Sequence, residues 1–275
     1  MNHEPNLSIF VVHYSKLKTR KLYLENFFLE NKITVNWITE KKLESIKRPL
    51  ISESKGIFGV SEKKIGMDLG INSRSLVFSR RKARLQGYLL YLRSYIARKG
   101  NSYTTGSLPP KIPLTRAWQE LQIMHFSALR AGIKLKSKWI LVLEDDALPN
   151  NFAFHKIKNI IENFDAKNTW INLNSGAGLE RTKSEKKIDS NGIFRVRPAA
   201  TRCAVAYLIS RDLAVKMTGF VDRYGLPDWL PIDFIYQALL RKSRAKAYWQ
   251  DPPLFEQGSE NGTYGSLFEL KRRLK

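Results

Sequence analysis

The stretch that decides the fold is Trp139-Ile140-Leu141-Val142-Leu143-Glu144-Asp145-Asp146-Ala147-Leu148-Pro149. Five apolar residues run without a break into three consecutive carboxylates. An unbroken apolar run that contains Val and Ile is typical of a strand covered on both faces, as parallel strands of α/β proteins are, although a buried helix segment gives the same pattern. Ligands of open α/β sheets bind at the carboxyl ends of the strands, so we expect the carboxylates at that edge.

The three carboxylates predict a cation site. Adjacent negative groups repel one another, and partial burial raises their pKa values unless cations lie beside them. A hard divalent ion, which prefers oxygen ligands, is the cation best suited to compensate three adjacent carboxylates. The alternative is a polar loop in which one Asp caps the next helix and water solvates the others.

Length and composition indicate one α/β domain spanning residues 1–275, or one domain with an inserted lobe. The chain is 43% hydrophobic, enough to bury a full core. The single cysteine, Cys203, excludes an internal disulfide framework and suits a reducing compartment. We find no signal-peptide core and no apolar run long enough to span a bilayer, so we expect a cytoplasmic protein.

A formal charge of +22 predicts a polyanionic partner, which could be nucleic acid, a phosphorylated substrate or an anionic leaflet. Residues 41–99 hold 15 basic and 4 acidic residues, half of that net charge. Within them, 79–99 has the pattern of a basic amphipathic helix, suited to a membrane surface or packed on the domain with its basic face in water. We treat 41–110 as a basic, partly helical insertion.

The chain begins with a βαβ pattern. Residues 8–14 read as an apolar strand, the basic segment 16–21 leads into a helix, and 34–38 alternate like a second, parallel strand. Lys16 to Lys21, Arg20 among them, would lie at the same sheet edge as the carboxylates, or would be solvated residues of a helix start. Further predicted elements are helices at 115–131, from 150 and from 210, and strands at 170–174, 193–196, 203–209 and 245–249. We expect the strands at 193–196 and 203–209 to pair with each other.

Two other places carry candidate site residues. His125 lies on the apolar face of the helix predicted at 115–131, where a histidine is more often a core residue than a ligand. Asp228 and Asp233 lie in a segment stiffened by Pro227 and Pro231. Pro231 in the first turn of a helix would place Asp233 at the positive end of the helix dipole, either as a reactive group or as a cap.

Taken in order, several motifs resemble glycosyltransferase family 25, which includes bacterial lipopolysaccharide sugar transferases. The most specific is Leu143-Glu144-Asp145-Asp146-Ala147. The others are Ile9 to Tyr14 with Arg20, Leu114-Thr115 to His125, Ala206 to Arg211, Pro231-Ile232-Asp233 and Pro252-Pro253-Leu254. The match covers nearly the whole chain except about residues 41–110.

The resemblance implies a GT-A-like nucleotide-sugar-binding fold with a mostly parallel central sheet. It implies a hexosyltransferase that moves a sugar, with galactose expected, from a UDP-sugar to a lipopolysaccharide or other glycan acceptor. A divalent metal, Mn²⁺ by expectation, would be held by Glu144 and Asp146 and would neutralise the diphosphate leaving group.

The resemblance also suggests roles for individual residues. Inverting transfer needs a base for the acceptor hydroxyl, and Asp233 is the candidate with Asp228 in reserve. The expected donor-binding residues are Arg20 at the phosphates, Asp145 at a ribose or sugar hydroxyl, Asn174 at the donor sugar, and His125.

The partners expected are therefore a nucleotide-sugar donor, a glycan or lipid-linked acceptor and an anionic membrane surface at the inner face of the membrane. Nucleic acid is not expected for a transferase. The alternative function is a basic nucleic-acid- or membrane-binding module with a degenerate, inactive transferase fold. A metal-dependent nuclease or phosphatase is weaker, because it would want more carboxylates from other strand ends.

Overall fold

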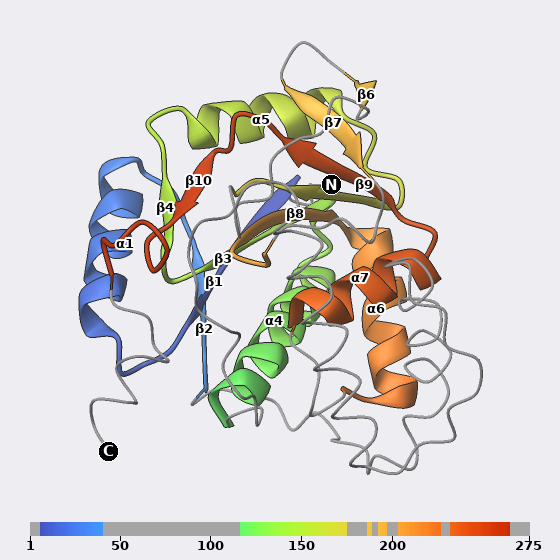
Figure 1. Ribbon diagram of the computed structural model, residues 1–275, viewed down its shortest axis with the longest axis horizontal. Coiled ribbons are helices and arrows are strands. Elements are labelled where there is room, and N and C mark those ends of the chain that lie inside the picture. Colours follow the sequence, from blue (N-terminus) through green and yellow to red (C-terminus); the bar gives the residue numbers. More distant parts are fainter. Residues whose placement is uncertain are drawn as a thin grey trace, which may run out of the picture.

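A computed structural model describes residues 6–40, 116–174, 186–188, 192–196, 203–226 and 232–264. The predicted insertion at 41–110, including its basic helix, lies outside these residues. The fold is α/β, with helices on both faces of a large sheet (Figure 1). The elements are β1 Leu7–His13, α1 Lys18–Glu30, β2 Asn36–Thr39, α4 Arg116–Lys134, β3 Trp139–Glu144, β4 Ala147–Pro149, α5 Ala153–Asn163, β5 Thr169–Asn172, β6 Lys186–Lys187, β7 Ile193–Val196, β8 Ala206–Ser210, α6 Arg211–Tyr224, α7 Ile232–Lys242, β9 Lys246–Gln250 and β10 Phe255–Gln257.

The main sheet has eight strands in the order β2-β1-β3-β8-β5-β9-β7-β6. Strands β2, β1 and β3 are mutually parallel, which confirms the βαβ opening. Only β8 and β7 run against the other six, so the prediction of a mostly parallel sheet is confirmed in strand direction. The predicted pairing of the strands at 193–196 and 203–209 is wrong, because β7 pairs with β9 and β6 while β8 lies between β3 and β5.

The unbroken apolar run of β3 is explained by helices on both faces of the sheet. Ile140 and Val142 pack into one core with α4, α6 and α7. Trp139, Leu141 and Leu143 point to the opposite face and pack with α1 and α5. All five are completely buried, so the alternation of a strand is present but both of its faces are apolar.

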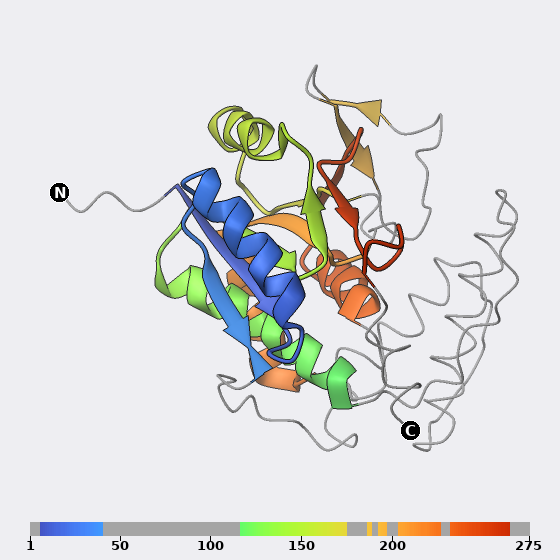
Figure 2. The same ribbon diagram turned by 90° about the vertical axis from the view of Figure 1, so that its left-hand side faces the viewer.

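A second, two-stranded sheet joins β10 to β4 in antiparallel register (Figure 2). Strand β4 begins immediately after the acidic run, and the pairing sets Gln257 opposite Ala147. The backbone N–H of Gly258 then donates to the carbonyl oxygen of Asp146 over 2.8 Å. A segment more than a hundred residues further along the chain is thereby fixed beside the carboxylates.

Helix α4 differs from its prediction in one respect. It continues through Gly132, which was expected to end it, and stops after Lys134. A Cβ atom at Gly132 would lie 2.6 Å from Cδ1 of Ile140 on β3, so the glycine permits close packing of the helix on the sheet. None of the helices that the structure describes combines the length and apolar character needed to cross a bilayer.

Candidate functional site

The acidic run lies at the carboxyl end of β3, beside the end of β1. Glu144 is the last residue of β3 and is in register with Val12 of β1, while Asp145 and Asp146 form the turn that follows. The run borders a pocket of about 100 Å³, which has room for a cation with a few waters. The pocket wall consists of Val12, Tyr14, Leu17, Arg20, Ala117, Leu121, Met124, Glu144, Asp145, Asp146, Gln257 and Ser259.

Asp145 is held by groups from β1 and α1. Its Oδ1 accepts a hydrogen bond from the Arg20 guanidinium at 2.9 Å, and its Oδ2 lies 2.9 Å from Nδ1 of His13. The backbone N–H of Tyr14 donates to the same Oδ2 at 3.2 Å. Arg20 is buried although it is charged, and the ion pair explains how a cation is tolerated there. Arg20 therefore lies at the pocket, as the sequence predicted, with one N–H group already directed at Asp145.

Asp146 has one occupied and one unpartnered oxygen. Its Oδ2 accepts a 2.5 Å hydrogen bond from the Ser259 hydroxyl and lies 3.8 Å from the Arg20 guanidinium. Its Oδ1 is buried, and no hydrogen-bond partner for it is found among the described residues. Burial raises the pKa of Asp146, while the Ser259 hydroxyl, the Arg20 charge and the nearby Gln257 amide act in the opposite direction. A buried oxygen without a donor suits a cation ligand, because an unsatisfied buried acceptor is costly.

Glu144 faces the other side of the site, towards α4. Its Oε1 lies 3.2 Å from Nε2 of His125, and 18% of its side chain is exposed. Burial raises the pKa of Glu144 well above its usual value, and repulsion from Asp146 and Asp145 adds to the effect. A cation next to Glu144 would reverse this shift, since it would stabilise the ionised carboxylate.

His125 is completely buried and does not line the pocket. Besides Glu144 it contacts Tyr207, whose hydroxyl lies 3.1 Å from the Nδ1 atom of the histidine. Burial lowers the pKa of His125 from its ordinary 6.5 to about 4, so the ring is neutral at neutral pH. The structure thus places this predicted donor-binding residue behind Glu144, as a core histidine bonded to a carboxylate of the site.

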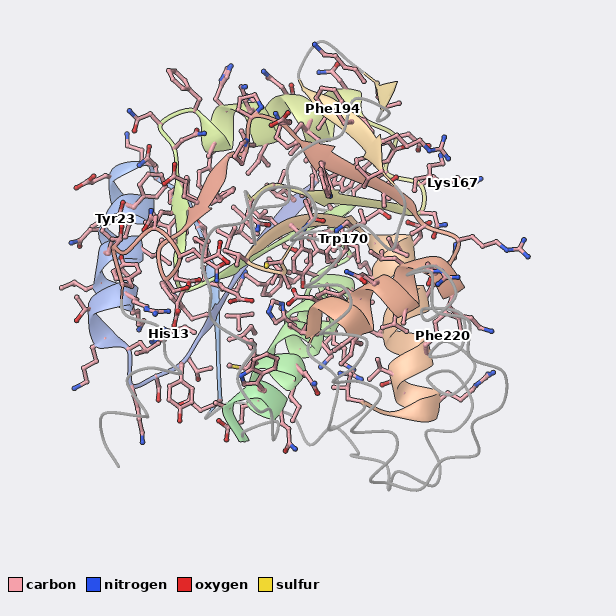
Figure 3. The ribbon with its side chains drawn as sticks, viewed as in Figure 1. His13, Tyr23, Lys167, Trp170, Phe194 and Phe220 are labelled. Carbon is pink, nitrogen blue, oxygen red and sulfur yellow. The ribbon has the colours of Figure 1, made fainter. Side chains whose placement is uncertain are left out.

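The segment 255–264 adds residues that the sequence did not single out. Gln257 and Ser259 line the pocket, and the ring of Tyr264 lies 5.2 Å from the Arg20 guanidinium carbon. The edge of that ring also faces Tyr23 of α1. Figure 3 shows Tyr23 and His13 towards the α1 side of the molecule. The sequence signal for this segment is the pair of prolines that precedes strand β10. No local pattern in the sequence indicates that β10 ends beside the acidic run.

Two other predicted site residues, Asn174 and Asp233, lie away from the pocket wall. Asn174 is buried and forms an isolated bridge to Phe255 at the base of the segment 255–264. Asp233 lies in the first turn of α7, as predicted, and its Oδ1 accepts a 2.7 Å hydrogen bond from the backbone N–H of Ala204. Asp228 lies outside the described residues.

The acidic run offers a divalent ion a small set of ligands. Within the described part of the chain, no three His, Cys, Asp or Glu side chains are arranged to hold a metal ion. Asp145 is turned to Arg20 and His13, which leaves Glu144 and Asp146. Two carboxylates fit an ion of the Mg²⁺ type, which protein sites bind through one or two carboxylates together with substrate phosphates.

Neither a scan against models of protein families nor a search of curated proteins finds a match to the chain.

Proposed function

We propose that the chain is a metal-assisted glycosyltransferase with a GT-A-like nucleotide-sugar-binding fold. It would transfer a hexose, with galactose expected, from a UDP-sugar to a lipopolysaccharide or other glycan acceptor. The observation that carries the proposal is the pair Glu144 and Asp146 at one pocket, with Oδ1 of Asp146 buried and unpartnered. The ordered motifs that resemble family 25 support the same activity.

Glu144 and Asp146 would hold the divalent ion, Mn²⁺ by expectation, together with the donor diphosphate. The ion, when bound, would neutralise charge that develops on the departing diphosphate. Arg20 adds a fixed positive charge at the same wall of the pocket, and Asp145 keeps its guanidinium in place. Asn174 retains its proposed role at the donor sugar, supported by its bridge to the strand that enters the site.

Asp233 remains the proposed base for inverting transfer, with Asp228 in reserve. Its position at the start of α7 is half-buried, and its charge acts on His125 by raising the pKa of that ring. Asp233 is therefore electrostatically coupled to the α4 side of the acidic run. A carboxylate of this kind can accept the proton of an acceptor hydroxyl once substrate is bound.

The proposal is tested by a screen of UDP-sugars for binding and for slow hydrolysis, with and without Mn²⁺. We expect one donor to bind and to be hydrolysed only with Mn²⁺, and Asp146→Asn to lower the hydrolysis rate on the order of 100-fold. Asp222→Asn, at an exposed carboxylate near the end of α6, is the matched control and should behave as the unaltered protein. Failure of every UDP-sugar to bind with Mn²⁺ would refute the proposal.

The charge of +22 favours a second function, a nucleic-acid- or membrane-binding module with an inactive transferase fold. This function requires steeply salt-dependent binding to DNA, RNA or anionic vesicles that Asp146→Asn leaves unchanged. Vesicle binding together with Mn²⁺-dependent donor binding would instead support a transferase at the inner face of the membrane.

A further inference from the structure

A buried chain of hydrogen bonds runs from Glu144 into the core. The Oε1 atom of Glu144 lies 3.2 Å from Nε2 of His125, and Nδ1 of His125 lies 3.1 Å from the Tyr207 hydroxyl. The Tyr207 and Tyr236 hydroxyls are 2.7 Å apart. The four residues come from β3, α4, β8 and α7, and His125, Tyr207 and Tyr236 are at most 1% exposed. Four elements distant in sequence thus meet in one polar chain inside an apolar core.

The direction of this chain is fixed when Glu144 is ionised. A carboxylate has no proton to donate, so Nε2 of His125 must carry the N–H that reaches Oε1. A neutral ring then has a lone pair on Nδ1, which accepts from the Tyr207 hydroxyl. The Tyr207 oxygen in turn accepts from the Tyr236 hydroxyl. Each of the three hydrogen bonds of the chain then has one donor and one acceptor.

Aromatic packing keeps the histidine ring from turning. Trp170 stacks on Tyr207 with centroids 4.1 Å apart and planes inclined by 16°. The rings of His125 and Tyr207 are stacked with centroids 5.8 Å apart, and Tyr236 and His125 meet edge to face at 5.9 Å. Trp170, which is labelled in Figure 3, is 1% exposed, so this packing lies in the core and not at the surface. A ring held in this way keeps Nε2 directed at Glu144 and Nδ1 directed at Tyr207.

We propose that His125 is a positioning residue whose Nε2–H fixes one oxygen of Glu144 and leaves the other for the cation at the pocket. The second oxygen of Glu144 has no hydrogen-bond partner in the described part of the chain, and Glu144 borders the pocket that His125 does not reach. His125 thereby acts through Glu144 and not on the donor directly. This inference rests on the proposed cation site at Glu144 and Asp146.

Two substitutions of His125 separate its two hydrogen bonds. His125→Gln places an amide N–H near the position of Nε2 and keeps a donor for Glu144. His125→Asn keeps an acceptor near the position of Nδ1 for Tyr207 but does not reach Glu144. Both variants bury a neutral amide in the same core, so a loss of packing affects both. Mn²⁺ binding is measured by electron paramagnetic resonance at saturating UDP, and thermal unfolding of each variant is recorded beside it.

We expect His125→Asn to weaken Mn²⁺ binding about 10- to 100-fold, as loss of an outer-shell partner of a metal ligand does, and His125→Gln to retain most of the affinity. Equal affinities in the two variants, whether both normal or both weakened, would overturn the role of the Nε2–H bond. Should His125→Asn not fold, His125→Leu replaces it, because leucine fills a similar volume and offers Glu144 no donor, and normal Mn²⁺ affinity in that variant would overturn the inference. Absence of Mn²⁺ binding by the unaltered protein would instead refute the proposed function itself.

Discussion

The two sides of the acidic run hold their carboxylates by different means. On the α1 side, Asp145 is paired with the buried Arg20 at 2.9 Å and with His13 at the same distance. On the α4 side, the side chain of Glu144 has one hydrogen bond among the described residues, to the neutral ring of His125, and two tyrosine hydroxyls lie behind that ring. Neighbouring carboxylates of one tripeptide therefore have a cationic environment on one side and a neutral one on the other.

The difference indicates where an added cation would bind. The charge of Asp145 is already compensated, so an added ion gains little there. Glu144 and Asp146 have pKa values raised by burial, and Asp146 has an oxygen without a donor. The ion pair of Asp145 therefore fixes the α1 side of the site, whereas burial of Glu144 and Asp146 favours the binding of a positively charged ion.

The largest expected effect is that of removing Arg20, the positively charged residue on the α1 side. Arg20→Met would leave Asp145 buried without its charged partner, and the free energy of unfolding should fall by about 3–5 kcal/mol. Denaturant unfolding measures it. The neighbouring Lys21, which forms an exposed pair with Glu25 on the same helix, is the control, and Lys21→Met should cost less than about 1 kcal/mol. Equal losses in the two variants would contradict the asymmetry between the two sides.

The neutral environment on the α4 side should make the stability of the protein depend on pH. The pKa of His125 is lowered by burial to about 4, so the native protein resists protonation that the unfolded chain accepts near its ordinary 6.5. The contribution to stability is fully present above pH 6.5 and is lost as pH falls towards 4, by about 3 kcal/mol in total. His125→Gln should reduce this loss in unfolding experiments between pH 7 and 4, whereas substitution of the exposed His155 should not.

The α1 side is the part of the site that the sequence predicted best. An apolar strand followed by carboxylates, and a basic segment after the first parallel strand, are local patterns that place both at one sheet edge. The structure confirms that Arg20 lies 2.9 Å from Asp145. Both signals lie within short stretches whose order the βαβ pattern fixes, so pairing of β1 with β3 was enough to bring them together.

The other parts of the site depend on long-range contacts that no local sequence pattern predicts. Ser259 reaches Asp146 across 113 positions of sequence, through a pairing of β10 with β4. The role of His125 depends on Tyr207 and Tyr236, which read as ordinary apolar positions of a strand and a helix. The sequence predicts a helix end at Gly132 because glycine commonly stops helices, whereas in the structure the absence of a side chain permits contact with Ile140.

That contact predicts an intermediate effect on the α4 side. Gly132→Ala improves helix propensity by about 1 kcal/mol, but its methyl group would lie 2.6 Å from Ile140. Overpacking of this kind costs about 1–3 kcal/mol, so we expect no gain or a net loss of stability in denaturant unfolding. Gly219→Ala in α6, where the added methyl group would meet nothing within 4 Å, is the matched control and should stabilise the protein. A gain in both variants would mean that α4 is not held tightly on β3.

The smallest expected effect concerns Ser259, which joins the segment 255–264 to the acidic run. Ser259→Ala removes the 2.5 Å hydrogen bond to Oδ2 of Asp146 and should lower the free energy of unfolding by about 1 kcal/mol, because Ser259 is half-buried and water can replace part of the bond. The same change removes an interaction that lowers the pKa of Asp146, so Mn²⁺ affinity near pH 6 should fall more than it does near pH 8. Ser259→Thr retains the hydroxyl and should preserve both properties. Identical behaviour of the Ala and Thr variants would show that Asp146 keeps its orientation without this bond, and the pairing of β10 with β4 would then be a support of the fold alone.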